Sequence, residues 1–259
     1  MGTQYSVIVT SHNRPHLLAR ALRSVGMQET DSIEVIVAMD VWCKDSVQVV
    51  NDFEHPHKKL LVLPGFKGPS ETRNTAKDQA RGEWIVFLDD DDQLIPGYLA
   101  DLTPHVQDRN QVLWTNYIVQ QEHIDGNQFE SLGWEEKLIE DRNPEELEIS
   151  NFIPNSSLVY PRELIRDIDF DIHLSSLEDW DYLINIKRKY AMKPISLFSS
   201  VISMPTNKLT RNSGSQQSDD HFMDILHIYR KWRSNNPLIK ELRLKKMNNR
   251  FININQDHF

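Results

Sequence analysis

Features that mark several other classes of protein are missing from this 259-residue sequence. Its single cysteine, Cys43, excludes an internal disulfide and a zinc site built from cysteines. No apolar run approaches the roughly 20 residues that are needed to cross a bilayer. Residues 1–9 lack the basic start and the long apolar stretch of a signal peptide. From these absences we expect a cytoplasmic protein.

A basic excess, the usual footprint of a nucleic-acid-binding protein, is also missing. The net charge is −9 and the isoelectric point is about 5.6, so we expect no nucleic-acid partner. The charge is uneven, because residues 230–250 contain eight lysines and arginines and one acid, Glu241. What is present, a hydrophobic fraction of 39%, is enough to fill the core of a soluble globular protein.

Strand-like and helix-like patterns alternate over the first 95 residues. Apolar runs predict strands, and apolar residues at helical spacing predict helices between them. The predicted strands are residues 5–10, 34–39, 60–63 and 84–88, and the predicted helices are residues 14–25 and 69–81. Continuous apolar strands separated by helices indicate an α/β fold with a parallel sheet that is covered on both faces.

The pattern changes after Pro96. We predict strands at residues 112–121, 128–134, 158–160 and 197–204, and a helix over residues 176–190. Residues 206–218 are polar and predict a loop. Two further helices follow, separated by a break at residues 235–237, and they form a C-terminal helical extension.

Four consecutive carboxylates, Asp89–Asp92, follow the predicted strand 84–88. In an extended backbone Asp89 and Asp91 point to the same side. A divalent cation would relieve the repulsion among the carboxylates, and hard oxygen ligands suit Mg²⁺ or Mn²⁺. A solvated acidic turn or a helix cap is the alternative interpretation. The position favours a site, because ligands of open α/β sheets bind at the carboxyl ends of the strands.

Other polar residues are expected at the same edge of the sheet. The first predicted strand leads into the segment Thr10–Arg14, and the second leads into Asp40. Both segments should converge on one crevice. Each residue alone also has a structural interpretation, since Thr10 or Asn13 could cap the next helix and Asp40 could begin a turn.

Taken together, these motifs resemble the family-2 glycosyltransferases with a GT-A fold. The resemblance covers about residues 5 to 205. The segments that carry it are Ser6–Val25, Glu34–Asp40, Gly68–Ala76, Gly82–Asp92, Pro154–Leu164 and Phe170–Ile184. The resemblance implies an inverting enzyme that transfers a sugar from a nucleotide-sugar donor, such as a UDP-sugar, to a saccharide or lipid-linked acceptor. Surface polysaccharide biosynthesis is the pathway expected from the habits of the family.

The resemblance also implies roles for residues that contact the donor. Asp40 would accept a hydrogen bond from the ring NH of the base, and Asp89 would bind the ribose or a metal-bound water. The positions that would line the base and ribose site are Thr10, His12 and Arg14, and those near the rest of the donor are Arg73 and Asn74.

Two acidic positions match the metal ligand and the catalytic base of the family. Asp91 would bind Mn²⁺ or Mg²⁺, which would stabilise the departing nucleotide. Asp179, in the Glu178-Asp179 pair, would take the proton of the acceptor hydroxyl. Helix capping is the alternative for this pair, because Ser175 and Glu178 fit an S-x-x-E capping box.

Several other residues are candidates for substrate contacts. Trp134 and Trp180 could stack on acceptor sugars, although Trp180 also falls on the apolar face of its helix and could belong to the core. Arg211 and Lys208 could close over the diphosphate as a lid, or lie in an ordinary solvated loop. His221 is the nearest candidate for a further metal ligand, but it falls on a predicted helix.

The chain departs from the family pattern after the second strand. Many relatives have Asp-Asp-Gly-Ser there, whereas this sequence has Met39-Asp40-Val41-Trp42.

Two other functions remain open from the sequence. The first is a carbohydrate-cleaving enzyme that uses paired carboxylates, and the second is a non-catalytic module that binds a sugar or a nucleotide.

The expected organisation has three parts. Residues 1–95 form a nucleotide-sugar-binding half, and residues 96–215 form an acceptor-binding and catalytic half of the same domain. Residues 216–259 form the C-terminal helical extension. Its basic helices are expected to touch an anionic membrane surface, to pack on the catalytic domain or to form a dimer.

Overall fold

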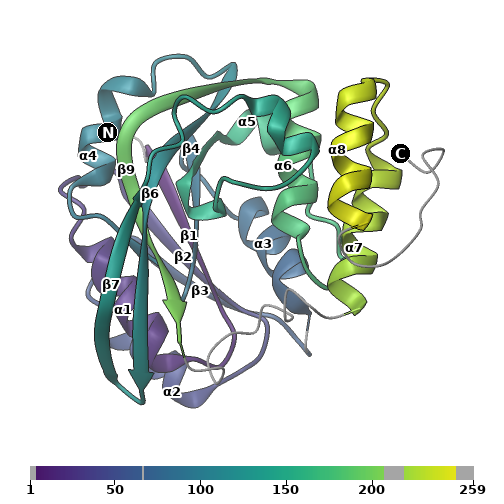
Figure 1. The fold of residues 1–259 in the computed structure, drawn as a ribbon. Helices are drawn as coiled ribbons and strands as arrows, with labels where there is room; N and C mark the ends of the chain where they lie inside the picture. The colour runs from purple at the N-terminus through teal and green to yellow at the C-terminus, as the bar shows by residue number, and fades with distance from the viewer. Residues whose placement is uncertain (1–3, 66, 207–218, 249–259) are drawn as a thin grey trace.

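A nine-stranded mixed sheet with helices on both faces forms the body of the protein (Figure 1). The computed structural model describes residues 4–65, 67–206 and 219–248. The strand order is β3-β2-β1-β4-β8-β6-β9-β5, and β7 pairs with β6. The strands are β1 (Tyr5–Ser11), β2 (Ile33–Met39), β3 (Lys58–Val62), β4 (Trp84–Asp89), β5 (Gln93–Leu94), β6 (Gln111–Asp125), β7 (Gln128–Lys137), β8 (Leu158–Pro161) and β9 (Ala191–Pro205).

Eight α-helices and three short 3₁₀ helices are present in the described part of the chain. The α-helices are α1 (Pro15–Gly26), α2 (Lys44–Asp52), α3 (Gly68–Asp78), α4 (Tyr98–Leu102), α5 (Arg162–Ile165), α6 (Glu178–Lys189), α7 (Asp219–Lys231) and α8 (Pro237–Asn248). The 3₁₀ helices are η1 (Thr103–His105), η2 (Pro144–Glu148) and η3 (Asn155–Ser157).

The parallel part of the sheet aligns the strand ends that matter for function. β1 pairs in parallel with β2 and β4, and β2 pairs in parallel with β3. In this register Thr10 lies opposite Ala38 on one side and Asp89 on the other. The segments that follow β1, β2 and β4 therefore leave the sheet at one edge, as predicted.

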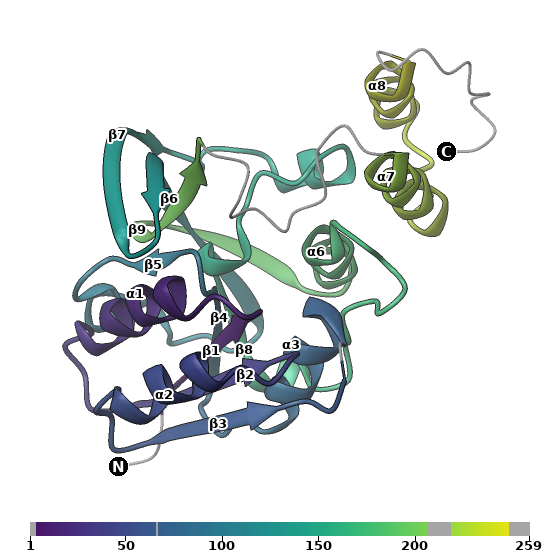
Figure 2. The same ribbon diagram turned by 90° about the horizontal axis from the view of Figure 1, so that it is seen from below.

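Alternating residues of each central strand fill two separate cores. Val7 and Val9 of β1 face α1 and α2, whose buried residues include Leu18 and Leu22. Ile8 of β1 faces the opposite side, where side chains of α3, α5 and α6 complete a second core. Figure 2 shows the layers, with α1 and α2 on one face of the sheet and α3 and α6 on the other. The helices on both faces of the sheet confirm the α/β architecture that the apolar strands predict.

The remaining strands extend the same sheet beyond β4. β8 pairs antiparallel with β4 and with β6, and β6 pairs in parallel with β9. Strands β1–β5 of the first predicted half and β6–β9 of the second therefore belong to one continuous sheet. Helices α2, α4 and α5 and the short strand β5 were not predicted, and β9 begins at Ala191 rather than near residue 197.

The C-terminal helices pack against α6 through a third apolar cluster (Figure 1). Trp180 and Ile184 of α6 contact this cluster, to which α7 contributes Ile225 and Tyr229. Basic residues of this region also turn inward, and Arg243 is fully buried. These contacts bear out packing on the body of the protein, which was one of the three expected roles. Among the helices described, none combines the length and the apolar character that a membrane span requires.

Candidate active site

A cavity of about 740 Å³ opens at the edge where β1, β2 and β4 end. Helices α3 and α6 present their first turns to it, and η3, β9 and α7 complete the wall. The polar residues that line it include Thr10, Ser11, His12, Arg14, Asp40, Thr72, Arg73, Asp89, Asp91, Asp92, Asn155, Ser175, Ser176, Glu178, Asp179, Ser203 and His221. The structure thus brings together most of the residues that the sequence predicted for the site.

Arg73 joins the two acidic motifs of the cavity. Its guanidinium donates to Asp89 at 2.7 Å and to Glu178 at 2.6 Å. Thr10 also donates to Asp89, at 2.9 Å. Burial alone would raise the pKa of Asp89, but the charge and hydrogen bond of Arg73 outweigh burial and lower this pKa. Asp89 is therefore an ionised acceptor whose position is fixed from β1 and α3.

The next two carboxylates share Arg14. Its guanidinium bonds to Asp90 and donates to Asp91 at 3.0 Å, while the backbone NH of His12 donates to Asp90 at 3.3 Å. Asp90 is fully buried, whereas Asp91 lines the cavity together with Asp89. The predicted alternation of the side chains is therefore present in the first three carboxylates.

Asp92 lies at the end of a buried network of hydroxyl groups. Its carboxylate accepts from Ser156 at 3.1 Å and from the backbone NH of Ser203 at 3.3 Å. Burial and the neighbouring Asp91 raise its pKa well above the ordinary value. Burial likewise raises the pKa of Asp90, to about 7, against the opposing charge of Arg14. Together these shifts show that burial disfavours the ionised form of both carboxylates.

His12 and Asp40 form a pair at the β2 side of the cavity. The Nδ1 atom of His12 lies 2.7 Å and 2.9 Å from the two oxygens of Asp40. Asp40 is buried, and it uses the histidine as its partner in this structure. A nucleobase whose ring NH donates to Asp40 would therefore lie beside the imidazole of His12, which already bonds to the same carboxylate.

The turn that enters α6 differs from the capping box that the sequence suggested. Leu177 occupies the N-cap in a left-handed conformation with φ of 61°, and no side chain caps the helix. Ser175 donates instead to Asp224 of α7 at 2.8 Å, and the backbone NH of Ser176 donates to the same carboxylate. Glu178 is bonded to Arg73. The capping-box interpretation is wrong, because both of its members have partners far along the chain.

Asp179 lies in the first turn of α6 and lines the cavity. Its Oδ1 accepts from the backbone NH of Trp180 at 2.7 Å, and its Oδ2 accepts from the amide of Asn151 at 3.1 Å. Burial, followed by the charge of Glu178, raises the pKa of Asp179 to about 7. A carboxylate with such a pKa is suited to accept a proton near neutral pH.

Three candidates lie away from the cavity wall. The amide of Asn74 is used inside the protein, because it donates to the carbonyl of Phe170 and accepts from its NH. Trp180 is buried and donates to the carbonyl of Leu147, so the core alternative is correct for this residue and stacking on a sugar is not. Trp134 is exposed on β7 and does not line the cavity. Lys208 and Arg211 fall outside the described residues.

His221 does reach the cavity. It belongs to α7, and its Nδ1 lies 3.3 Å from the hydroxyl of Ser176. Its position on a helix agrees with the prediction, and the same helix supplies Asp224 to the turn before α6. Helix α7 is therefore part of the wall of the site, which composition alone did not indicate.

Arg20 and Asn151 are among the contributors to the site that the sequence did not predict. Arg20 of α1 donates to the carbonyl of Asp91 at 2.9 Å and forms a buried ion pair with Glu122 of β6. Asn151 bonds to Asp179. Arg20 lies within the family-like segment Ser6–Val25 but was not predicted as a site residue, and Asn151 lies outside the segments that carry the resemblance. The one available signal for Arg20 was a charged residue at a position that falls on the buried side of an amphipathic helix.

Comparisons with known proteins identify the family to which this site belongs. A family model described as Glycosyl transferase family 2 matches residues 6–169, which is more than half of the chain. The chain belongs to glycosyl transferase family 2. Its named relatives are glycosyltransferases, and this argues against a carbohydrate-cleaving enzyme and against a non-catalytic module.

The curated relatives match different shares of the chain. GalNAc(5)-diNAcBac-PP-undecaprenol β-1,3-glucosyltransferase of Campylobacter jejuni is 32% identical over 133 residues, which are 50% of this chain and 43% of that protein. The uncharacterized glycosyltransferase YwdF of Bacillus subtilis is 25% identical over 220 residues, which are 83% of this chain and 77% of YwdF. The chain spans 43% of the length of the Campylobacter enzyme and 26% of that of the succinoglycan biosynthesis protein ExoO of Rhizobium meliloti.

Solved structures confirm the GT-A-type fold. TarS 1–349 of Staphylococcus aureus in complex with UDP-GlcNAc has a TM-score of 0.68 at 19% identity and covers 95% of this chain and 72% of that one. The mannosyltransferase PcManGT of Pyrobaculum calidifontis in complex with GDP-Man and Mn²⁺ has a TM-score of 0.64 at 15% identity and covers 95% and 70%.

Proposed function

We propose that this protein is a metal-dependent, inverting glycosyltransferase that moves a sugar from a UDP-sugar to a saccharide or lipid-linked acceptor. The observation that carries the proposal is a single cavity that holds carboxylates at two separate places. Asp89 and Asp91 lie at the end of β4, and Asp179 lies at the start of α6. The first pair is suited to the donor and the second site to the acceptor. Inversion belongs to the proposal because a single displacement needs one base and one group that stabilises the leaving nucleotide.

The donor half of the proposal rests on the strand ends. Thr10 lies near the end of β1, His12 and Arg14 follow this strand, and Asp40 follows β2. All four side chains line the cavity. We assign them to the base and ribose. A uracil ring NH can donate to Asp40. The complex of TarS with UDP-GlcNAc supports a uridine donor by analogy of fold.

The chemistry of the carboxylates fits a divalent cation at Asp91. Burial and the charge of Asp89 raise the pKa of Asp91 in spite of the opposing charge of Arg14, and a bound cation would offset the repulsion between the two carboxylates. Among the residues that the structure describes, no three His, Cys, Asp or Glu side chains are arranged to hold a metal. Asp91 would therefore bind Mn²⁺ or Mg²⁺ together with the diphosphate of the donor. When bound, the cation supplies positive charge that stabilises the departing nucleotide.

The acceptor half of the proposal assigns the base to Asp179. The carboxylate takes the proton of the acceptor hydroxyl as this hydroxyl attacks the sugar. All cavity-lining residues after position 95 except His221 belong to residues 96–206, and we assign this half of the domain to the acceptor. The undecaprenol-linked substrate in the name of the Campylobacter relative supports a lipid-linked acceptor, and we place the protein in surface polysaccharide biosynthesis.

Two substitutions test the two halves separately. Asp91→Asn should abolish transfer and weaken Mn²⁺-dependent binding of UDP, measured by titration calorimetry. Asp179→Asn should leave this binding nearly intact and lower kcat by about 10²-fold or more. Unchanged Mn²⁺-dependent binding by Asp91→Asn would remove Asp91 as the ligand. Near-normal transfer by Asp179→Asn would remove Asp179 as the base. If GDP binds as tightly as UDP, the assignment of a uracil base to the donor nucleotide is wrong.

A membrane role for the C-terminal helices remains a separate part of the proposal. Arg230, Arg233 and Lys245 are exposed and could face an anionic surface. Replacing all three with glutamine should weaken sedimentation with anionic liposomes. Sedimentation that does not change would exclude this role, and a dimer would appear instead as a concentration-dependent mass in light scattering.

A further inference from the structure

The segment 147–151, which begins in the last turn of η2 and leads toward η3, is bonded to three different helices through consecutive carbonyl groups. The carbonyl of Leu147 accepts from the indole of Trp180 in α6 at 2.7 Å. The carbonyl of Glu148 accepts from Arg243 in α8 at 2.7 Å, and that of Ile149 accepts from Tyr229 in α7 at 2.7 Å. Bonds of this kind fix the path of the backbone at each successive residue.

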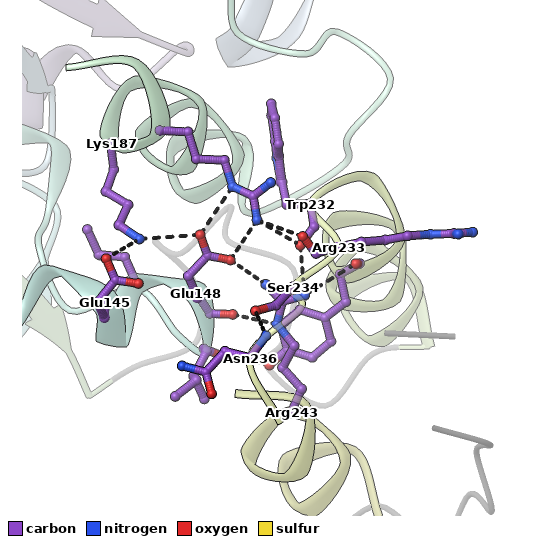
Figure 3. Close-up of polar contacts among 12 residues, drawn as sticks. Glu145, Glu148, Lys187, Trp232, Arg233, Ser234, Asn236 and Arg243 are labelled. Carbon is purple, nitrogen blue, oxygen red and sulfur yellow. Dashed lines mark hydrogen bonds and ion pairs between the residues drawn. The ribbon is translucent and has the colours of Figure 1, made fainter. Parts of the chain in front are cut away.

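The side chain of Glu148 adds a charged anchor to the same segment (Figure 3). Its buried carboxylate accepts from Arg188 at 3.1 Å and 2.9 Å and from Arg243 at 2.8 Å, and Lys187 lies 3.4 Å away. Burial would raise the pKa of Glu148, but the hydrogen bonds and charges of these three cations outweigh burial and lower it. Glu148 is thus an ionised group that ties the segment to α6 and α8.

Asn151 lies three residues after this anchor and points its amide at Asp179. Its Oδ1 accepts from the backbone NH of Ile153 at 3.0 Å, which fixes the orientation of the amide. Its Nδ2 consequently faces Oδ2 of Asp179, at 3.1 Å. The other oxygen of Asp179 accepts from the NH of Trp180. The carboxylate therefore has one bond from its own helix and one from the anchored segment.

We propose that Asn151 is a positioning residue for the transfer reaction, which orients the carboxylate of Asp179 toward the acceptor, and that α6, α7 and α8 act on Asp179 through the segment 147–151. The inference rests on the proposed function, because it takes Asp179 as the base. A neutral amide suits this task. It fixes one oxygen of the carboxylate without bringing a full positive charge that would make the base weaker.

The ionisable groups around Asp179 are accounted for on each neighbouring element. Glu178 lies on the same helix, Arg73 on α3, Asp89 on β4 and Tyr160 on β8. Farther along the cavity wall lie Asp91, Asp92 and His221. Removing the amide of Asn151 changes none of these groups. A change in the pH dependence of an Asn151 variant therefore reports on the hydrogen bond to Asp179.

The test compares Asn151→Ala with the wild-type protein and with Asn143→Ala. Asn143 caps η2 in the same part of the chain, is exposed and has no contact with the cavity, so its variant is a matched control. For Asn151→Ala we expect kcat to fall by about 10-fold while the KM for the donor stays within about twofold. The acid-side midpoint of kcat/KM should rise by about 1 pH unit, because the lost bond favoured the ionised carboxylate. Asn143→Ala should match the wild type.

The outcomes separate this inference from the proposed function. A wild-type protein that transfers no sugar from any nucleotide-sugar refutes the proposed function. If the wild type transfers sugar and Asp179→Asn does not, an unchanged kcat and pH midpoint in Asn151→Ala refute the inference. Loss of UDP binding by this variant also refutes it, since a positioning role concerns the acceptor side. Should Asn151→Ala fail to fold, the nearly isosteric Asn151→Asp replaces it. Its second carboxylate should raise the midpoint further, and an unchanged midpoint overturns the proposal.

Discussion

Replacing the proposed base should make the folded protein more stable. Burial and the charge of Glu178 raise the pKa of Asp179 to about 7 from an ordinary value of 3.8. A carboxylate whose pKa is higher in the folded than in the unfolded state destabilises the fold when it is ionised. This cost is absent below about pH 4, grows as the pH rises toward 7 and is complete above it. Asp179→Asn removes the charge and keeps the shape, so it should increase the free energy of unfolding at pH 8.

The size of the effect follows from the two pKa values. At about 1.4 kcal/mol per pH unit, the difference between 3.8 and about 7 corresponds to roughly 4 kcal/mol. This is an upper limit, because the side chain of Asp179 is only partly buried and water screens part of the cost. We expect a gain of about 1–2 kcal/mol at pH 8 and no gain at pH 4.

A second aspartate on the same helix provides a matched control. Asp181 is buried two residues farther along α6, and its carboxylate accepts from Lys231 at 2.8 Å and from the indole of Trp232 at 2.7 Å. Asp181→Asn should therefore destabilise the protein at pH 8, by about 1.5–3 kcal/mol, since it weakens hydrogen bonds to a charged group.

Urea unfolding at pH 8 and pH 4, followed by tryptophan fluorescence, measures both variants against the wild type. The reasoning is refuted if Asp179→Asn is destabilised at pH 8 to the same extent as Asp181→Asn. It is also refuted if the gain of Asp179→Asn is equal at the two pH values, because a packing effect would not depend on ionisation.

Two further predictions concern the framework of the site. Arg73→Met removes the cation shared by two cavity carboxylates and should lower the free energy of unfolding by about 3 kcal/mol or more. The control Arg109→Met removes a cation from an exposed ion pair and should change the free energy of unfolding by less than about 1 kcal/mol. Equal effects of the two substitutions in urea unfolding would contradict the burial argument. Gly82→Ala would place a Cβ 2.4 Å from the backbone nitrogen of Ser6 and should lower the Tm by several degrees, whereas Gly26→Ala meets its nearest atom at 3.4 Å and should leave the Tm nearly unchanged. Similar Tm values in thermal unfolding by circular dichroism would show that the β1 backbone can move.

Local patterns predicted the central sheet because its strands are buried on both faces. The apolar runs of β1 and β4 stand out without knowledge of their partners. Helix α2 was missed because it is short and polar, with Val50 as its one buried large apolar residue. The start of β9 was missed because Pro194 lies inside it, and a proline argues against a strand. The parallel pairing of β6 and β9 joins residues about 80 positions apart, and such pairing leaves no local signal.

The site was predicted in its residues but not in its connections. The resemblance to the family pointed to Asp89, Asp91 and Asp179, all of which line the cavity. The bridge from Arg73 to Glu178 spans 105 positions, and no pattern in the sequence predicts it. The capping box failed for the same reason, since Ser175 bonds to a residue 49 positions away. Long-range ion pairs decide how these side chains are oriented, and periodicity carries no information about them.

The wall of the cavity extends from Thr10 to His221, and this has a consequence for the newly made chain. The β1–β4 sheet can form from the first 90 residues, but the site needs the turn before α6 and then α7, which contribute late contacts of high sequence separation. Such contacts form slowly. During synthesis the strand ends to which we assign the donor therefore emerge before the part to which we assign the acceptor, and Trp180 and Ile184 stay uncovered until α7 emerges. Ribosome-bound chains that stop before residue 219 should bind chaperones and transfer no sugar.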